Sequence, residues 1–544
     1  MPPSTAGRFA ASSSYAHSLL PPRELWPVFD FSAPHLRGYP ARLNLAAALL
    51  DAAVADGLAG RPMLHYGDST WSYGFLLDRV QRVAGVLARV FALRPGECVL
   101  LRAGNVPMLA AAWLAVVRCG AIAVAASPML RAQELGFIVD KLRIRLALCE
   151  EGLEAEFQPV LARGSWLESV RSFTALGVGG AELDRLLARE HAGGGWADTA
   201  ADDIATVVFS SGTTGTPKAV AHAHRNLLAA CDGWRHPLPI AEGEVMCATS
   251  GMAFTYGLTS NLLYPLRFRA SAVLLPRSTP EALLEAAERH RIGALVTVPT
   301  VLHKLLPQAG AGGLRSVAKV FSSGETLPRE LGRAWREASG HAVVEGFGSS
   351  ELLTRVIGPN ARGEPAGSLG TAVPGYTACL VDEEGQVLPR GRRGFLAVRG
   401  PTGCRYLGDE ERQRAFVRNG WNVMTDLFEQ DADGCFWYVG RQDDIIVSSG
   451  YNIAAAEVER AIATHPAVTE CAVVGVPDAA RGMIVRACVV LRGGESASEA
   501  TARRIQEHVK AAIAPYKYPR DVRFLERLPR TSSGKVERYK LRQA

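Results

Sequence analysis

The chain has 544 residues, more than one ordinary hydrophobic core supports, so we expect two or more domains. Hydrophobic residues make up 48% and charged residues 21%, a composition typical of soluble globular proteins. A net charge of +6 is too small at this length to indicate a nucleic-acid-binding protein. The 10 cysteines are scattered singly, without the spacing of a zinc site or a disulfide framework, so we expect a cytoplasmic protein.

The N-terminal stretch 1–20 is small and polar, and we expect it to be disordered. It lacks the apolar segment of a signal peptide. Since no run in the sequence reaches about 18 uninterrupted apolar residues, we also expect no membrane span.

Segments with helical periodicity alternate with short β-branched runs over most of the chain. Helices are expected at 44–55, 72–91 and 108–119, and strands at 96–104, 121–126, 204–209, 272–275, 294–298, 318–321 and 342–345. This alternation predicts an α/β fold with a large N-terminal domain, 21–440, whose sheets are mostly parallel. After residue 440, helices at 454–464 and 498–512 accompany strands at 468–476 and 483–491, which predicts a small α+β C-terminal domain at 441–544.

The segment from Ser210 to Lys218 contains only Ser, Gly, Thr, Pro and Lys, and it directly follows a predicted strand. Glycines let the backbone approach a ligand closely, and free N–H groups and hydroxyls suit phosphate oxygens. Lys218 adds a movable positive charge. The order of residues differs from a Walker loop, and this segment alone is also compatible with a flexible linker.

Four further segments recur in order downstream. They are EGFGSSE at 345–351, GWNVMTD at 420–426, GRQDDII at 440–446 continuing to 452, and PRTSSGK at 529–535. Together with 210–218, they resemble the motifs of the adenylate-forming superfamily, which comprises acyl-CoA synthetases, aryl-CoA ligases and adenylation domains. The resemblance spans nearly the whole chain and implies a small, mobile C-terminal domain with a hinge near 441–443.

The resemblance implies an AMP-forming acid–thiol ligase that uses ATP, Mg²⁺ and coenzyme A. Glu351 and Thr213 would hold Mg²⁺, and Lys535 would bridge the substrate carboxylate and the α-phosphate. Asp426 would bind the ribose hydroxyls, with Arg441 beside it. The other residues implied to bind the nucleotide are Ser210, Ser211, Gly212, Thr214, Gly215, Lys218, Gly324, Glu325, Glu345, Gly346, Phe347 and Ser350.

In this family the small domain rotates about the hinge between two half-reactions, which places Asp443 at the hinge. Gly450 and Tyr451 would face the site while the thioester forms. Two departures stand out: Met424 and Thr425 replace the usual Thr-Gly before the ribose aspartate, and Val447 replaces a lysine often found after the hinge.

Phe254, Thr255, Tyr256 and Gly257 stand where relatives line the acyl site. With 323–328 and the N-terminal segments 22–31 and 39–44, this pattern resembles benzoate and 2-aminobenzoate (anthranilate) CoA ligases. A flat aromatic acid suits a slot between aromatic side chains. The remaining residues expected at the acyl site are Gly348 and Thr354.

We therefore expect anthranilate, or a close benzoate analogue, to be activated to aryl-AMP with release of pyrophosphate and then transferred to coenzyme A. The alternatives are a benzoate–CoA ligase and an enzyme that loads a separate carrier protein. Phe254 and Tyr256 could instead be ordinary core aromatics. We expect no nucleic-acid partner, and either a monomer or a homodimer.

Overall fold

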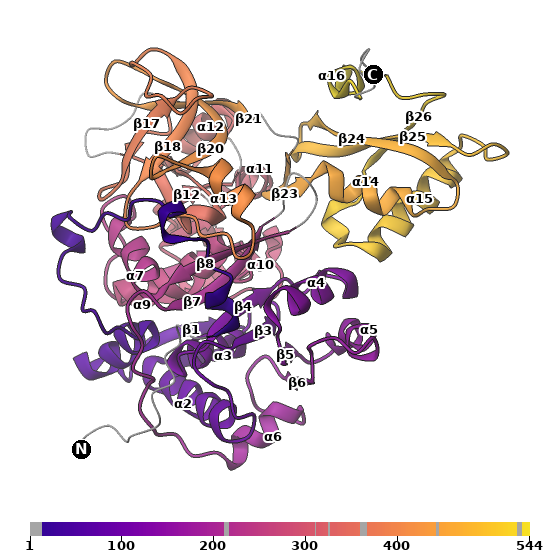
Figure 1. Cartoon of the computed structure of the whole chain (residues 1–544). Coiled ribbons are helices and arrows are strands. Elements are labelled where there is room, and N and C mark those ends of the chain that lie inside the picture. Colours follow the sequence, from indigo (N-terminus) through magenta and orange to yellow (C-terminus); the bar gives the residue numbers. More distant parts are fainter. Residues whose placement is uncertain are drawn as a thin grey trace.

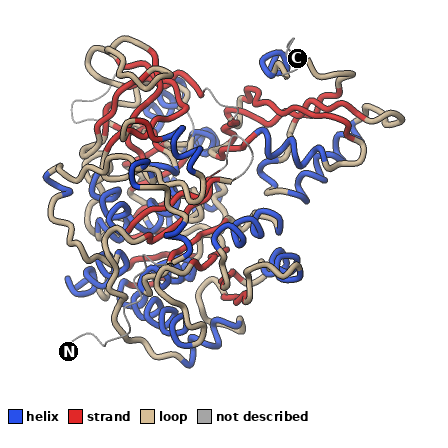
Figure 2. The backbone as a smooth tube through the Cα atoms, viewed as in Figure 1, coloured by secondary structure: helices blue, strands red, loops and turns tan. Residues whose placement is uncertain are grey.

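The computed structural model describes residues 14–210, 217–310, 312–324, 327–359, 367–441, 445–529 and 536–543, and it describes residues 312, 313, 441 and 539 by their backbone alone. Helices and strands alternate through the large domain, and a smaller C-terminal domain lies at one side (Figures 1 and 2). Within the described ranges, no helix combines the length and apolar character needed to cross a bilayer.

The first large sheet has the strand order β6-β5-β3-β4-β7-β8. All its neighbouring strands are parallel except β7 and β8, which run antiparallel. Its strands are β3 (Cys98–Arg102), β4 (Ile122–Ala126), β5 (Leu146–Glu150), β6 (Ser169–Phe173), β7 (Ile204–Ser210) and β8 (Lys218–Ala223). The predicted strand at 204–209 is therefore confirmed as β7.

The second large sheet has the order β13-β12-β11-β9-β10-β1-β2 and is parallel apart from the β1–β2 pair. The predicted strands at 272–275, 294–298, 318–321 and 342–345 all belong to it. Its strands are β1 (Pro62–Tyr66), β2 (Ser69–Ser72), β9 (Val245–Ala248), β10 (Ser271–Val273), β11 (Ala294–Thr297), β12 (Lys319–Ser322) and β13 (Val343–Glu345).

Helices pack between and around these sheets. Every residue of α3 (Pro107–Arg118) is buried, as expected for a helix that is apolar on all sides. The helices of the large domain are α2 (Tyr73–Arg89), α3, α4 (Ala132–Leu142), α5 (Gln158–Ala162), α6 (Glu182–Arg189), α7 (His224–Gly233), α8 (Thr255–Leu258), α9 (Tyr264–Phe268), α10 (Pro280–His290), α11 (Pro299–Leu305), α12 (Arg329–Ser339) and α13 (Glu410–Phe416).

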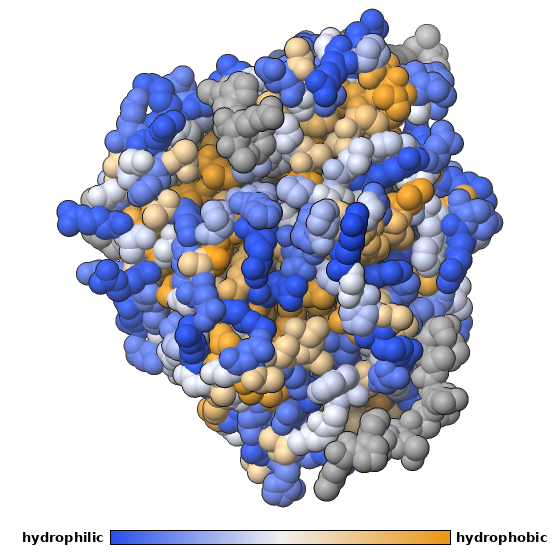
Figure 3. All heavy atoms as spheres, turned by 90° about the vertical axis from the view of Figure 1, so that its left-hand side faces the viewer, coloured by the Kyte–Doolittle hydropathy of each residue, from blue (hydrophilic) through white to orange (hydrophobic). Residues whose placement is uncertain are grey.

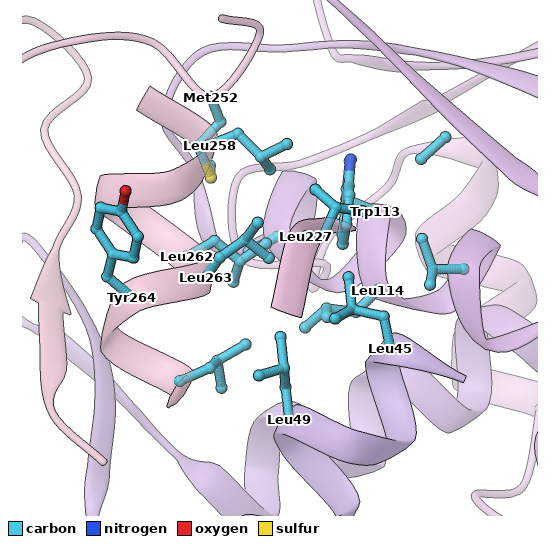
Figure 4. Close-up of a cluster of buried hydrophobic side chains, with 14 of the residues drawn as sticks. Leu45, Leu49, Trp113, Leu114, Leu227, Met252, Leu258, Leu262, Leu263 and Tyr264 are labelled. Carbon is cyan, nitrogen blue, oxygen red and sulfur yellow. The ribbon is translucent and has the colours of Figure 1, made fainter. Parts of the chain in front are cut away.

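Leucines from several of these helices meet in one buried cluster (Figure 4). It joins α3 and α7 to the π-helical turns η4 (Ala47–Asp51), η5 (Val54–Leu58) and η7 (Thr259–Leu263), and Tyr264 of α9 lies at its edge. The face shown in Figure 3 is mostly hydrophilic, with smaller hydrophobic areas between the polar side chains. The side chains labelled in Figure 4 are Leu45, Leu49, Trp113, Leu114, Leu227, Met252, Leu258, Leu262, Leu263 and Tyr264.

Two smaller antiparallel sheets complete the large domain, and our sequence analysis did not predict them. One contains β14 (Phe347–Gly348), β15 (Arg355–Gly358) and β16 (Thr371–Ala372). The other contains β17 (Thr377–Val381), β18 (Arg393–Arg399), β19 (Val417–Arg418), β20 (Trp421–Gln430) and β21 (Phe436–Arg441). The sheets of the large domain are therefore mostly parallel, as predicted, and these two small antiparallel sheets are the exception.

The C-terminal domain begins with a hairpin, which we did not predict, and continues with a sheet and helices, as the sequence predicts. Its strands are β22 (Ile445–Ser448), β23 (Tyr451–Ala454), β24 (Val468–Asp478), β25 (Gly482–Leu491) and β26 (Asp521–Phe524). Its helices are α14 (Ala455–Ala463), α15 (Glu499–Ala512), the 3-10 turn η11 (Pro515–Lys517) and α16 (Arg538–Gln543). The boundary at 440/441 stays a prediction, since 442–444 lie outside the described residues.

The part of the N-terminal stretch that the structure describes is ordered, although we expected 1–20 to be disordered. Residues Tyr15–Ser18 form α1, which Ser14 caps. Ala16 is buried against the first sheet, and the carbonyl of Leu19 accepts a hydrogen bond from Gly408. Order here comes from tertiary packing, which the polar local sequence does not reveal.

Candidate active site

A cavity of ≈ 720 Å³ opens where strands of both large sheets end. Residues that follow the carboxyl ends of β3, β4, β9, β11 and β12 all line it, as is usual for ligand sites in α/β folds. The C-terminal domain contributes the opposite wall. The predicted site residues that line this cavity are Ser210, Phe254, Thr255, Tyr256, Gly324, Gly348, Ser350, Thr354, Gly450 and Tyr451.

Glu351 lies beside this cavity in a 3-10 turn, η10 (Ser350–Leu352), and is buried. Its Oε1 accepts a hydrogen bond from the hydroxyl of Tyr406 at 2.8 Å and one from Ser210 at 3.4 Å, and Nζ of Lys218 is 3.9 Å away. Burial alone would raise the pKa of Glu351, but the charge of Lys218 and the bond from Tyr406 hold it below its usual value. The carboxylate of Glu351 is therefore ionised at neutral pH.

A hydrogen bond from β8 holds the turn that carries Glu351. Nε2 of His222, on β8, lies 2.9 Å from the carbonyl of Ser350 and donates to it. Complete burial lowers the pKa of His222 to about 3, so the imidazole is neutral. The strand that follows the predicted phosphate loop thus positions the carboxylate.

Glu351 and Ser210 offer the hard oxygen donors that Mg²⁺ prefers. The described residues contain no cluster of three or more His, Cys, Asp or Glu suited to a metal. A magnesium ion needs only one or two protein carboxylates when phosphates and water complete its shell. The residues present therefore fit Mg²⁺ delivered with a nucleotide, with Glu351 as its protein carboxylate.

The segment 345–348 forms the edge of the site. Burial raises the pKa of Glu345 to about 7, although its carboxylate accepts a hydrogen bond from Leu327 N at 2.9 Å. The carbonyl of Gly346 accepts a hydrogen bond from Ser323 at 2.6 Å. Phe347 packs edge-on against Phe428, at 4.9 Å between ring centroids. This packing fixes the backbone that leads into Gly348 and η10.

The predicted acyl-site aromatics differ in their surroundings. The hydroxyl of Tyr256 donates to the carbonyl of Thr297 at 2.9 Å, and burial raises the pKa of Tyr256 to about 12. Phe254 lies edge-on to Tyr451 of the C-terminal domain, at 5.8 Å. Gly257 does not line the cavity. Instead it packs on the backbone of Gly251, where a Cβ atom would lie 2.0 Å from the carbonyl oxygen.

A second cavity of ≈ 710 Å³ lies on the other side of Lys218. Tyr406, Met424 and Thr425 also line it, so the departure in the ribose motif borders open space beside Lys218. Asp426 is buried on β20, and its register partner on β21 is Arg441. The sequence pairing of Asp426 with Arg441 is therefore a cross-strand pair in the structure.

A buried ion cluster joins the two domains. Nζ of Lys517, in the C-terminal domain, lies 2.6 Å from a carboxylate oxygen of Glu134 on α4 and 2.6 Å from one of Glu457 on α14. The side chains of all three are between 6% and 8% exposed. Tyr516 stacks on Tyr451 at 4.2 Å beside this cluster. These contacts hold the Gly450 hairpin of the C-terminal domain against the cavity.

Residues 536–543, the last described stretch, do not line this cavity. Val536 packs with Leu528 and Leu541 against β24 and β25, and Arg538 forms an ion pair with Glu459. Figure 1 shows α16 above β24 and β25, on the opposite face of the C-terminal sheet from α14 and α15. Several predicted site residues lie outside the described residues: Ser211, Gly212, Thr213, Thr214, Gly215, Glu325, Asp443 and Lys535, together with the side chain of Arg441.

Sequence reasoning missed four contributors to the site. Tyr406 donates a hydrogen bond to the carboxylate of Glu351, and Arg355 lines the cavity. Glu134 and Lys517 form a hydrogen-bonded ion pair between the two domains. Only the position of Arg355 next to Thr354 could have drawn attention to it. A lysine in the basic C-terminal tail, by contrast, is most often a solvated one.

Comparisons with known proteins agree with this geometry. Residues 51–406 match the AMP-binding enzyme family, and residues 457–535 match the AMP-binding enzyme C-terminal domain. The chain is 32% identical over 511 residues to the benzoate–CoA ligase of Thauera aromatica, which covers 93% of this chain and 97% of that protein. It is 32% identical over 510 residues to the 4-hydroxybenzoate–CoA/benzoate–CoA ligase of Rhodopseudomonas palustris, which covers 92% and 94%.

Among solved structures, an anthranilate CoA ligase in complex with anthranoyl-AMP is 28% identical, with a TM-score of 0.72 and coverage of 93% of this chain and 98% of that one. The resemblance based on five sequence motifs is thereby confirmed. The chain belongs to the AMP-binding enzyme family of adenylate-forming enzymes and is an AMP-forming acid–CoA ligase.

Proposed function

We propose that this enzyme is an ATP- and Mg²⁺-dependent aryl-CoA ligase that acts on a benzoate-type acid, with anthranilate as the first candidate from the sequence. The observation that carries this proposal is the cavity that joins three parts. It has a carboxylate turn for nucleotide and metal, an aromatic wall at Phe254 and Tyr256, and an opposite wall from the C-terminal domain. Relatives that act on benzoate and hydroxybenzoate support the aromatic class.

The chemistry places one anion against another, so positive charge must gather where negative charge develops. We assign Lys218 to the phosphates and Glu351 to Mg²⁺, which would neutralise phosphate charge when bound. Lys535 would bridge the acid and the α-phosphate in the first half-reaction. Attack of the carboxylate oxygen on the α-phosphorus forms aryl-AMP and expels pyrophosphate. The thiol sulfur of coenzyme A then attacks the acyl carbon and expels AMP.

The position of the C-terminal domain suits the second step. Gly450 and Tyr451 line the cavity, whereas the residues flanking the Lys535 segment, Pro529 and Val536, do not. We therefore infer that this arrangement serves thioester formation, and that the domain must rotate to bring Lys535 to the nucleotide. The hinge assignment of Asp443 belongs to the same proposal.

The first test supplies ATP, Mg²⁺ and coenzyme A with a panel of aromatic acids and detects aryl-CoA and AMP by mass spectrometry. At least one benzoate-type acid should give both products. Formation of aryl-AMP without transfer to free coenzyme A would instead favour the alternative acceptor, a separate carrier protein. Absence of both products with every aromatic acid would refute the aryl assignment.

A second test separates the half-reactions. Lys535→Ala should lower aryl-AMP formation by about 10²–10³-fold, the usual loss when a positioned donor at a developing anion is removed. Thioester formation from supplied aryl-AMP should remain within about threefold of the unmodified enzyme. An equal loss in both half-reactions would contradict the role assigned to Lys535.

A further inference from the structure

Arg355 is a buried arginine in the wall of the active-site cavity. It begins β15, is 4% exposed, and pairs with Gly348 across the β14–β15 ladder. Its carbonyl accepts a hydrogen bond from the indole N–H of Trp234 at 2.6 Å, so its backbone is fixed. Nη2 of its guanidinium is buried and has no hydrogen-bond partner among the described residues.

Aromatic faces, rather than anions, surround the guanidinium. Its central carbon lies 4.1 Å from the ring centroid of Trp234, 5.1 Å from that of Tyr256 and 5.8 Å from that of Tyr264. Cation–π contacts of this kind hold the group in place but do not neutralise its charge. An arginine keeps its charge at any pH a protein experiences, so burial without an anion is costly.

The phenol oxygens of Tyr256 and Tyr264 accept hydrogen bonds from Arg355, but these neutral groups do not balance its charge. The hydroxyl of Tyr256 donates to Thr297, and that of Tyr264 shares a 2.8 Å hydrogen bond with Thr354. The carboxylate of Asp232, two residues before Trp234, accepts hydrogen bonds from Nε and Nη2 of Arg267 at 2.7 and 2.9 Å. No ion pair to Arg355 occurs in the described part of the chain.

We propose that Arg355 binds a second oxygen substituent on the acid substrate, separate from the carboxylate that is activated. This inference rests on the proposed function and specifies its substrate class. The substituent must accept hydrogen bonds, which a ring carboxylate or hydroxyl does and an amino group does poorly. A second carboxylate matches both the planar fork of the guanidinium and its charge, so we expect dicarboxylic aromatic acids to be the best substrates.

This inference and the anthranilate candidate lead to different rankings. If Arg355 selects an acceptor, anthranilate gains nothing over benzoate from this residue. If Thr255 or Thr354 instead selects the amino group, anthranilate leads. A single substrate panel distinguishes the two.

The experiment measures kcat/KM for aryl-CoA formation with benzoate, 2-aminobenzoate, the three hydroxybenzoates and the three benzenedicarboxylates. In the unmodified enzyme, at least one oxygen-substituted acid should exceed benzoate by about ten- to a hundredfold, with a dicarboxylate first. In Arg355→Leu this ratio should fall to within about threefold, because the oxygen-substituted acids lose more of their kcat/KM than benzoate does. Arg355→Lys, which keeps the charge without the fork, should retain part of the preference.

Arg235→Leu is the matched control, because Arg235 is exposed and its guanidinium lies over the face of Phe268, 5.9 Å from the ring centroid. It should leave the ranking unchanged. The ranking in the unmodified enzyme decides the matter even if substitution of Arg355 prevents folding. A preference for benzoate or 2-aminobenzoate would overturn the inference.

An equal loss for all acids in Arg355→Leu would also overturn the inference, since Arg355 would then act on the carboxylate they share or on the fold. Turnover of no aromatic acid by the unmodified enzyme would refute the proposed function itself, and this inference with it. Turnover of benzoate-type acids without an oxygen preference would refute the inference alone.

Discussion

At the residue scale, two buried histidines should make the stability of the fold depend on pH. They are His222 on β8 and His224 at the start of α7. His222 supports the Glu351 turn, and Nδ1 of His224 accepts a hydrogen bond from Leu45 N at 3.2 Å. Burial lowers the pKa of each to about 3, with nearby Arg405 and His17 respectively adding to the effect. Both side chains are therefore neutral in the folded protein at any pH near neutrality.

A folded-state pKa below the unfolded value of about 6.5 means that the unfolded chain takes up the proton first. Stability should therefore fall as the pH drops below about 6.5, by about 1.4 kcal/mol per pH unit for each such histidine. The slope of the unfolding free energy with pH between 5 and 6.5 reports how many protons are taken up on unfolding. In His224→Gln this number should be smaller by about one. Urea denaturation at a series of pH values measures this slope, and identical slopes for the two proteins would contradict the assignment.

The same scale shows how far sequence reasoning reaches. Glu351 and Lys218 could be singled out because glycines and hydroxyl-bearing residues surround them in their motifs. In the structure, Nζ of Lys218 lies 3.9 Å from Oε1 of Glu351. Arg355 could not be recognised in this way. An arginine at the start of a strand is usually exposed, and the burial of Arg355 depends on Trp234, 121 residues away.

At the scale of elements, the segment from Ser250 to α8 folds back on itself, and Gly257 makes this possible. A Cβ atom at 257 would lie 2.0 Å from the carbonyl oxygen of Gly251, whereas one at 251 would come no closer than 3.7 Å to Phe254. The two glycines thus offer a matched pair of substitutions. Only one of them is required by close packing.

Gly257→Ala should push the segment apart and displace Phe254 and Tyr256 from the cavity wall. Because overpacking costs about 1–3 kcal/mol, we expect the KM for the aromatic acid to rise about tenfold or more. Gly251→Ala should stay within about twofold of the unmodified enzyme. Steady-state kinetics with saturating ATP provide the comparison, and similar KM values for both variants would show that the fold-back does not set the acyl site.

Elements also show where sequence prediction stops. The parallel strands of the two large sheets were predictable because their apolar runs alternate with helices. The antiparallel β17–β21 sheet was not, because its strands alternate buried and exposed positions irregularly and β20 carries a register shift. Its pairing depends on distant partners, as that of β18 with β20 illustrates.

At the scale of the whole molecule, the Glu134–Lys517–Glu457 cluster fixes how the two domains meet. Burial by itself lowers the pKa of Lys517, but Tyr516 and the two carboxylates raise it well above its usual value. Breaking a buried ion pair by removing one partner typically costs 3–5 kcal/mol, because the remaining charge stays uncompensated. The cluster should therefore favour this domain arrangement over any other.

Lys517→Met should reduce thioester formation from supplied aryl-AMP by about ten- to a hundredfold, as the population shifts away from this arrangement. Aryl-AMP formation, which we propose uses another domain arrangement, should change by less than about threefold. Lys510→Met is the control, since Lys510 pairs with Glu507 on the surface of α15. An equal loss in both half-reactions would show that Lys517 supports folding rather than domain position.

The capping of α4 has a consequence for the speed of the enzyme. Glu134 accepts hydrogen bonds from Arg131 N at its own helix terminus as well as from Lys517 and Ala514 across the interface. When the domains separate, the bond to Arg131 stays and water can reach the freed oxygen, so α4 keeps its cap. In the proposed rotation, the free-energy cost of separating the domains therefore falls mainly on Lys517 and recurs in each catalytic cycle. Stronger contacts between the domains at this junction would slow turnover, although they would stabilise the enzyme against unfolding.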